Sequence, residues 1–198
     1  EIPAVAGYVL TLRYKEICDQ DLDESFLERP NRSFLERSDL LLVFQGYRGF
    51  FRPLAGFSDY VHAELRSITR TRYLDRVDAL GDLPIVMNIR HGTDFPDPVI
   101  ANGLLKVGTK TPIQWFVRSL EVLREAVNAK VPATIVSDAR IEVLRPLLSM
   151  PHVSLLRPTS PISDLLALAK AKVLLASGAS SFSAWGAWLG QIPAVSHP

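Results

Sequence analysis

One segment combines the residue types that bind a phosphate group. Asn88-Ile89-Arg90-His91-Gly92-Thr93-Asp94 runs from an apolar stretch into a cation, a histidine and a glycine turn. The planar guanidinium of Arg90 is suited to hold two phosphate oxygens at once, and Gly92 lets the backbone approach a ligand closely. The same arginine is equally suited to an ion pair with Asp94 or Asp97, and the pattern alone leaves both interpretations open.

His91 and Asp94 are the two residues of this segment with the chemistry of a general base. Taken alone, His91 favours the plainer interpretation of a loop histidine that is satisfied by water. The chain has four histidines and one cysteine, without the spacing of a zinc site. We therefore expect the site to work without a metal.

A second segment, Ala133-Thr134-Ile135-Val136-Ser137-Asp138, also ends an apolar stretch in polar side chains. Asp138 is suited to accept hydrogen bonds from the ribose hydroxyls or the base edge of a nucleotide. An aspartate directly before a helix is also a good N-cap, and the spacing alone favours that interpretation.

A third segment, Ser177-Gly178-Ala179-Ser180-Ser181-Phe182-Ser183, is a turn of small residues that leads into a predicted helix. Small side chains expose backbone N–H groups, and the helix dipole adds partial positive charge there. Gly178, Ser180 and Ser181 are therefore candidate contacts of a diphosphate. Serine-rich helix starts are common without ligands, so this signal is weak by itself.

The elements around these segments indicate an α/β fold with a doubly wound parallel sheet. From Pro84 onward, short β-branched apolar stretches alternate with segments of helical periodicity. The expected strands are Ile85 to Arg90, Ala133 to Asp138, Val153 to Arg157, Val173 to Ser177 and Ile192 to Ser196. The connection from His91 to Lys110 is far longer than the usual ~2–6 residues, which marks a functional or mobile loop at the carboxyl end of its strand.

The clearest helix opens at Thr111-Pro112-Ile113-Gln114, where Thr111 is expected to cap and Gln114 to complete a capping box. Its expected buried stripe is Ile113, Phe116, Val117, Leu120, Leu123 and Val127. Three further helices are expected: one with Ile141 and Leu144 inward, one from Ser160-Pro161, and one from Ser180-Ser181 to Gly190. The last is expected to bury Trp185, Trp188 and Leu189.

The first 82 residues have weaker patterns. They predict strands at Tyr8 to Arg13 and Leu40 to Phe44, and a helix capped by Ser58 with Val61, Leu65 and Ile68 inward. We expect two domains, a partial N-terminal α/β domain over residues 1–82 and a Rossmann-like C-terminal domain over residues 83–198.

Composition excludes several classes of partner. With 22 basic and 21 acidic residues, no global field attracts the chain to nucleic acid. No apolar stretch is long enough to span a bilayer. The lone Cys18 favours a reducing compartment, and we expect a cytoplasmic protein, with membrane-peripheral as the alternative. The chain begins Glu1-Ile2-Pro3 without methionine, so a preceding leader or anchor remains open.

The order of the three segments resembles the superfamily of GDP-fucose-dependent fucosyltransferases, which includes the α-1,2 and α-1,6 enzymes and the protein O-fucosyltransferases. That family carries His-x-Arg-Arg-Gly-Asp, a strand ending in aspartate, and Ser-Ser-Phe-Ser. Here Asn88 to Asp94, Ala133 to Asp138 and Ser180 to Leu189 are similar, the last with the sequence SSFSAWGAWL. Thr111 to Phe116 is similar to the Thr-Pro-x-x-Trp-Tyr that opens the following helix.

This chain also departs from the family's pattern. Asn88 stands where the family has histidine, His91 where it has the second arginine, and Ala184 where tryptophan is usual. Arg-His-Gly is also similar to the α-1,6 type, so the motifs leave the acceptor linkage open. The Gly-Leu-Gly-Asn-Gln segment of the family's N-terminus is missing, and we expect a divergent, truncated member of bacterial type with an incomplete acceptor-side domain.

The resemblance implies an inverting, metal-independent glycosyltransferase of the GT-B type, with GDP-fucose as donor substrate and a glycan as acceptor. It implies that Asn88, Arg90, Gly92, Gly178, Ser180, Ser181 and Phe182 surround the diphosphate and the sugar, and that Asp138 holds the guanosine. Arg90 would stabilise the leaving diphosphate, with His91 and Asp94 as candidate bases. The alternatives are a nucleotide- or carbohydrate-binding module that has lost transfer, and a glycosyltransferase that uses another nucleotide sugar.

Overall fold

A computed structural model describes residues 56–93, 95–97, 109–157 and 160–198 in full, and the backbone of strands at 15–18, 40–43, 100–101 and 104–105. The chain divides into two compact units, Glu1–Ala55 and Gly56–Pro198. In the first unit, β1 (Lys15–Cys18) pairs in parallel with β2 (Leu40–Val43). The second strand was predicted. The strand predicted at Tyr8 to Arg13 lies outside the described residues.

The second unit is built on a parallel sheet. In the described part of residues 56–198 its five strands are β3 (Leu83–Ile89), β6 (Ala133–Ser137), β7 (Val153–Leu155), β8 (Ala171–Ala176) and β9 (Ala194–Ser196). Their order is β7-β6-β3-β8-β9, and every neighbouring pair is parallel. All five were predicted, each with bounds that differ by one to two residues, as is usual for strand ends.

This strand order has a switch point between β3 and β8. From β3 the chain moves outward through β6 to β7, then crosses the sheet and continues from β8 to β9 in the other direction. Parallel neighbours need right-handed crossovers, so a reversal of direction places the following helices on the opposite face. The predicted doubly wound α/β fold is therefore confirmed, and its switch point lies where the first and third polar segments end their strands.

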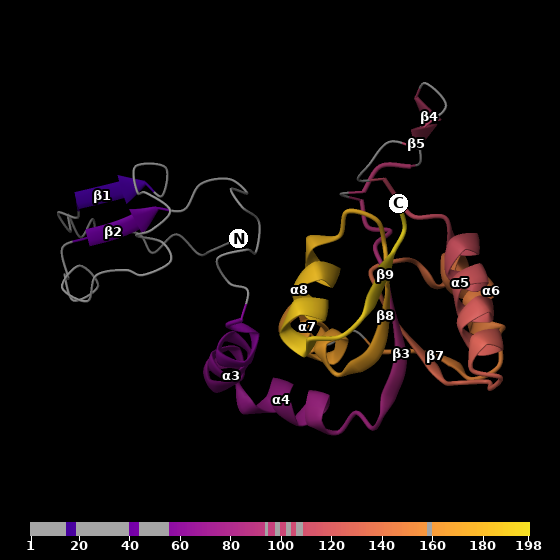
Figure 1. Cartoon of the computed structure of the whole chain (residues 1–198), viewed down its shortest axis with the longest axis horizontal. Helices are drawn as coiled ribbons and strands as arrows, with labels where there is room; N and C mark the ends of the chain where they lie inside the picture. The colour runs from indigo at the N-terminus through magenta and orange to yellow at the C-terminus, as the bar shows by residue number, and fades with distance from the viewer. Residues whose placement is uncertain are drawn as a thin grey trace. The chain divides into compact units, whose positions relative to one another are not determined.

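Two helices cover each face of the sheet (Figure 1). On one face lie α5 (Ile113–Ala126) and α6 (Ile141–Leu148), and on the other lie α7 (Pro161–Ala169) and α8 (Ser181–Gly190). The alternation of β3 serves both layers, since Met87 and Ile89 pack with Phe116 of α5 while Val86 packs with Leu168 of α7. Fully burying a side chain such as Phe116 contributes about 1.5–3 kcal/mol.

Helix α5 follows its predicted stripe with two differences. Phe116 and Leu120 are fully buried, but Val127 is 58% exposed because the helix has already ended at Ala126. The predicted cap at Thr111 is wrong: Pro112 is the N-cap residue, and no side-chain oxygen caps this helix. The hydroxyl of Thr111 has another partner, described below.

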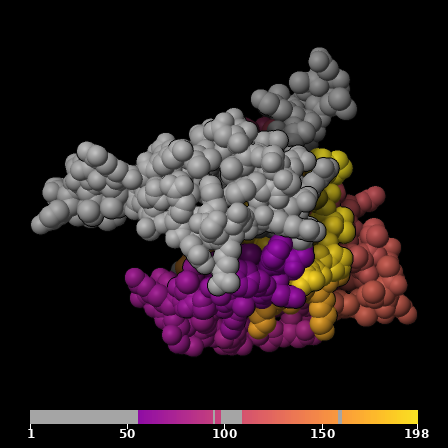
Figure 2. Space-filling view, turned by 60° about the vertical axis from the view of Figure 1, so that its left-hand side comes forward, coloured from indigo at the N-terminus to yellow at the C-terminus, as the bar shows by residue number. Residues whose placement is uncertain are grey.

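Two helices precede the sheet, α3 (Ser58–Ile68) and α4 (Thr71–Asp78). The predicted cap at Ser58 is wrong, since Phe57 is the N-cap, and Ile68 is 77% exposed rather than inward. Helix α3 packs against α8, and α4 packs against α7. Figure 2 shows the purple surface of these helices beside the yellow surface of the last residues. The compact unit begins at Gly56. The predicted domain boundary between residues 82 and 83 stays a prediction.

Helix α8 ends at Gly190 as predicted, but glycine does not supply the left-handed residue that follows. That residue is Gln191, with φ of 49°. Gly190 instead faces the backbone of α7, and a Cβ there would lie 2.2 Å from the carbonyl oxygen of Ala169. Leu189 is buried, whereas Trp185 and Trp188 are half-buried and pack edge to face.

The long connection after β3 contains an antiparallel pair of short strands, β4 (Ile100–Ala101) and β5 (Leu104–Leu105), which the sequence did not predict. None of the helices in the described ranges combines the length and apolar character that crossing a bilayer requires.

Candidate functional site

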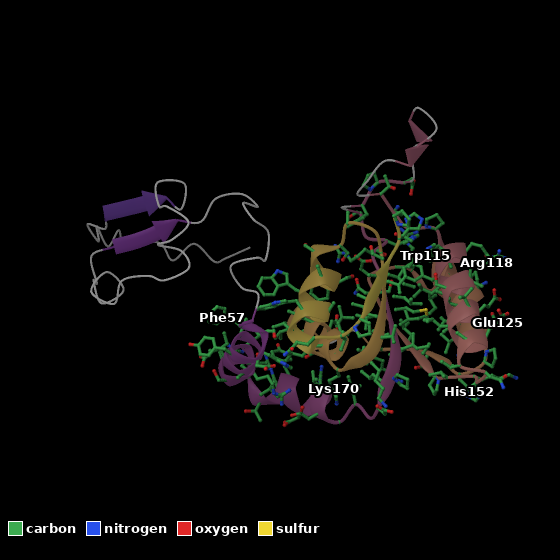
Figure 3. The ribbon with its side chains drawn as sticks, in the orientation of Figure 1. Phe57, Trp115, Arg118, Glu125, His152 and Lys170 are labelled. Carbon is green, nitrogen blue, oxygen red and sulfur yellow. The ribbon has the colours of Figure 1, made fainter. Side chains whose placement is uncertain are left out.

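The three polar segments meet at one edge of the sheet because they follow neighbouring parallel strands. Ile89 of β3 pairs with Ser137 of β6, and Asn88 pairs with Ala176 of β8. The residues that follow these strands therefore leave the sheet side by side. Trp115, at the start of α5, lies at the same end of the unit, whereas Lys170 and His152 lie at the opposite end (Figure 3).

Arg90 and Asp138 join the first and second segments. The guanidinium Nη1 lies 3.0 Å from Asp138 Oδ2, and the two side chains are 29% and 30% exposed. The backbone N–H of His91 donates to Asp138 Oδ1 over 2.7 Å. The Phe95 ring lies 5.3 Å from the guanidinium carbon of Arg90. A carboxylate and an aromatic face thus hold the arginine that was predicted to bind phosphate.

The sequence offered two acidic residues as ion-pair partners of Arg90. The described ion pair of Asp97 is with Lys110, whose Nζ lies 2.8 Å from the carboxylate. The hydrogen bond from Lys110 lowers the pKa of Asp97 below its ordinary value. Asp94, the other proposed partner and a candidate base, lies outside the described residues.

The N-cap interpretation of Asp138 is wrong. Arg140 is the N-cap residue of α6, without a side-chain cap. The local turn is satisfied by Ser137, whose hydroxyl accepts from the Ala139 N–H at 3.0 Å and donates to the Ile89 carbonyl at 2.7 Å. Ser137 thus stabilises the turn before α6 without capping the helix, and the Asp138 carboxylate contacts Arg90 and His91.

Ser177 fixes the other side of β3. Its hydroxyl accepts the backbone N–H of Arg90 at 2.9 Å, and its own N–H donates to the Asn88 carbonyl at 3.0 Å. Arg90 is therefore anchored from β8 through its backbone and from β6 through its side chain. From the sequence, Ser177 was expected only as part of the small-residue turn, although its position as the first polar residue after an apolar strand was a usable signal.

Asn88 faces the layer of α8. It is buried, and its Oδ1 accepts the Ser183 hydroxyl at 2.9 Å. The same hydroxyl lies 3.0 Å from Ser180 Oγ, which accepts the Ser183 N–H as the N-cap of α8. These contacts connect the first segment to the helix that begins the third. A direct contact of Asn88 with a ligand remains a prediction.

The turn at Gly178 and Ala179 is close to two other segments. The Gly178 N–H donates to Thr111 Oγ1 at 2.9 Å, and a Cβ on Gly178 would lie 3.0 Å from the His197 carbonyl oxygen. Ala179 has a left-handed φ of 54°. The His197 ring packs edge to face on Trp115, with centroids 5.5 Å apart. The close approach at Gly178 therefore accommodates chain segments, and sequence reasoning missed both His197 and Trp115 as neighbours of this turn.

The first turn of α8 has backbone N–H groups that its N-cap residue does not bind. Ser180 Oγ accepts the Ser183 N–H, and the Ser180 carbonyl accepts the Ala184 N–H. Among the residues described, no acceptor is recorded for the N–H groups of Ser181 and Phe182. Unpaired first-turn donors with the dipole behind them form a natural anion site. The Phe182 side chain packs against the core under α8.

Two more features complete the site. Gly92 accepts the Phe95 N–H at 3.1 Å and so turns the chain after β3. His91 Nε2 lies 2.8 Å from the Thr111 carbonyl oxygen. Within the described residues, no group of three or more His, Cys, Asp or Glu side chains is arranged to hold a metal ion.

No family model matches the chain, and no curated protein matches it. Among solved structures it is similar to POFUT1 in complex with GDP, with 15% identity over 88% of this chain and 59% of that one, and a TM-score of 0.49. A POFUT1 structure with GDP-fucose aligns with 14% identity over 69% of this chain and 49% of that one, at a TM-score of 0.43. The apo form of POFUT1 aligns with 12% identity over 93% of this chain and 74% of that one, at a TM-score of 0.44. Three of the POFUT1 structures are covered over only 46–49% of their length.

Proposed function

We propose that this chain is an inverting glycosyltransferase of the GT-B type that transfers fucose from GDP-fucose to a glycan acceptor. The observation that carries the proposal is the placement of Arg90 and the start of α8 on the two sides of the switch point between β3 and β8. Ligands of doubly wound folds bind beyond the carboxyl ends of the strands at that point. The motif order that resembles fucosyltransferases supplies the choice of donor.

The chemistry that this geometry supports is departure of a diphosphate. A leaving diphosphate gains negative charge as the bond to the sugar breaks, and positioned donors stabilise that charge. Arg90 contributes a guanidinium held by Asp138 at 3.0 Å, and α8 contributes the N–H groups of Ser181 and Phe182. In this proposal both act on the β-phosphate side, with Ser180, Gly178 and Gly92 forming the surrounding backbone.

Asp138 would hold the guanosine end while it orients Arg90. Each of its oxygens already has one partner, the Arg90 guanidinium or the His91 N–H. A carboxylate oxygen has two lone pairs, so both keep capacity for a ribose hydroxyl or a base N–H. His91 and Asp94 are the candidate bases. The proposal of a glycan acceptor rests on the motifs alone, and the proposal of a cytoplasmic or membrane-peripheral location rests on composition alone.

The test is a panel of nucleotide sugars, with release of free nucleotide and glycosylation of an acceptor library both measured. GDP-fucose is expected to give free GDP and a fucosylated product. Turnover with another nucleotide sugar instead would replace the donor and keep the reaction class. Absence of both turnover and GDP binding by calorimetry would overturn the proposal.

One observation favours the alternative of a binding module that has lost transfer. The positive charge of Arg90 is compensated by Asp138, Asn88 stands where the family has histidine, and His91 stands where it has the second arginine. Such a site would bind GDP without turning over. The same panel separates the two, because a module gives a calorimetric signal with GDP and no product with any donor.

Transfer is expected to survive metal chelation. The proposed site neutralises the diphosphate with a guanidinium and a helix N-terminus, and Mg²⁺ sites usually combine one or two carboxylates with substrate phosphates. Initial rates should therefore be equal with and without EDTA. Loss of activity in EDTA with recovery on added Mn²⁺ would show that a cation takes part in place of these donors.

A further inference from the structure

His91 makes a contact that determines which of its ring nitrogens carries a proton. Nε2 lies 2.8 Å from the carbonyl oxygen of Thr111. A carbonyl oxygen only accepts hydrogen bonds, so Nε2 must be the donor. In the neutral ring the other nitrogen, Nδ1, then carries the lone pair. Among the described residues, no partner of Nδ1 is recorded.

Thr111 is itself held in place. It is fully buried, and its hydroxyl accepts the N–H of Gly178 at 2.9 Å. Its carbonyl meets His91 while its side chain meets the turn after β8. Thr111 thus joins the first segment to the third, and it fixes both the tautomer and the orientation of the imidazole.

The two carboxylates described near His91 each have a cationic or N–H partner. Asp138 Oδ2 pairs with Arg90, and Asp138 Oδ1 accepts the His91 backbone N–H. Asp97 pairs with Lys110, whose hydrogen bond lowers the pKa of that carboxyl and makes it a weaker base. His197, the other histidine described at this edge, has its Nδ1 2.9 Å from the Pro198 carbonyl oxygen and packs edge to face on Trp115. His91 directly follows Arg90 at the end of β3, with Nε2 bound to Thr111, so its Nδ1 is the basic ring atom next to the proposed diphosphate contact.

We propose that His91 is the general base of the transfer, accepting the proton of the acceptor hydroxyl at Nδ1, and that Thr111 is the positioning residue that fixes its tautomer. This inference rests on the proposed function. The acceptor oxygen forms its bond to C1 of fucose as the bond from C1 to the β-phosphate oxygen breaks. The electron pair of the broken bond leaves with GDP, and the acceptor proton moves to Nδ1 while Nε2–H stays bonded to Thr111.

The pH profile of transfer tests the catalytic half in the full chain. His91→Gln keeps an amide that can donate to Thr111 but has no basic nitrogen. Loss of a general base should lower kcat about 10²–10⁴-fold. GDP affinity should be unchanged, and the fall in rate toward acid pH, the acid limb of the profile, should disappear. The matched variant His197→Gln, at the other histidine described at this edge, should keep that acid limb. An acid limb that persists in His91→Gln, or one that is lost in His197→Gln, overturns the assignment.

The role of Thr111 as positioning residue is tested by the tautomer of His91, which can be measured without turnover. Nitrogen-15 NMR of the histidine rings should show His91 protonated at Nε2 and bare at Nδ1 at alkaline pH. Thr111→Val keeps the carbonyl but removes the hydroxyl that anchors it to the Gly178 N–H. The carbonyl should then shift away from Nε2, which should mix the two tautomers and lower kcat, and Thr111→Ser should restore both. A proton on Nδ1 in the wild type overturns this inference and leaves the proposed function standing. Absence of transfer by the wild type, with the expected tautomer, overturns the catalytic half together with the proposed function.

Discussion

Replacing Arg90 with lysine is expected to lower the turnover of GDP-fucose by ~10²-fold or more, the size of effect seen when one charge-stabilising donor is removed. A lysine can pair with Asp138 as a point charge, but it loses the planar fork that holds two oxygens. It also loses the flat cation that lies over the Phe95 ring. The effect should fall mainly on kcat, because the charge on the diphosphate grows as the bond breaks.

The measurement is steady-state kinetics for GDP-fucose with GDP affinity by calorimetry. Arg66→Lys is the matched control, since Arg66 is also an ion-paired arginine, with Nη2 at 3.0 and 2.9 Å from the two oxygens of Asp78 on α4. It lies on α3, away from the strand ends that carry the motifs. The control should keep wild-type kinetics. An unchanged kcat in Arg90→Lys would remove Arg90 from the reaction.

The substitution Gly190→Ala is expected to destabilise the second unit by about 1–3 kcal/mol, the range for overpacking a close contact. Alanine in a helix normally stabilises relative to glycine by up to ~1 kcal/mol. Here the sign reverses, because the added Cβ would lie 2.2 Å from the Ala169 carbonyl oxygen and 2.9 Å from its Cα, so backbone must move. Gly186, one turn earlier, faces the side chain of Leu168 and not a backbone segment.

Thermal and urea unfolding measure this effect. A loss of 1 kcal/mol should lower Tm by roughly 2–4 °C for a chain of this size. Gly81→Ala is the control, since a Cβ at Gly81 meets nothing within 4 Å. The control should leave the free energy of unfolding within about 0.5 kcal/mol of the wild type. Equal stability of Gly190→Ala and the wild type would mean that α7 and α8 are further apart in solution than described.

The packing of α7 and α8 also shows that a short-range sequence preference can identify where a helix ends without identifying why glycine is there. The sequence placed the end of α8 at Gly190 from the preference of glycine for helix ends. The helix does end there, but the left-handed residue is Gln191, and the glycine is needed for the contact with Ala169. Short-range preference identified the position, and a neighbour distant in sequence supplied the reason.

Helix capping shows the same contrast between local preference and contacts distant in sequence. Ser160 and Ser180 were expected at the starts of α7 and α8, and both accept the N–H three residues on. Thr111, Ser58 and Asp138 have equally good local signals, yet none of them caps its helix. Capping competes with every other partner that folding brings within reach, and Thr111 and Asp138 both find partners on other strands or loops.

By itself, the sequence determined the elements that depend on near neighbours: the five parallel strands, the four helices that cover them, and the polar residues at the strand ends. Periodicity and apolar runs are local, so they are readable without a structure. Which polar residues meet was decided by the sheet order. The order β7-β6-β3-β8-β9 places Asp138 beside His91 across 47 residues of sequence and Ser183 beside Asn88 across 95. That order depends on where each crossover packs, which is a property of the whole core and of no single segment.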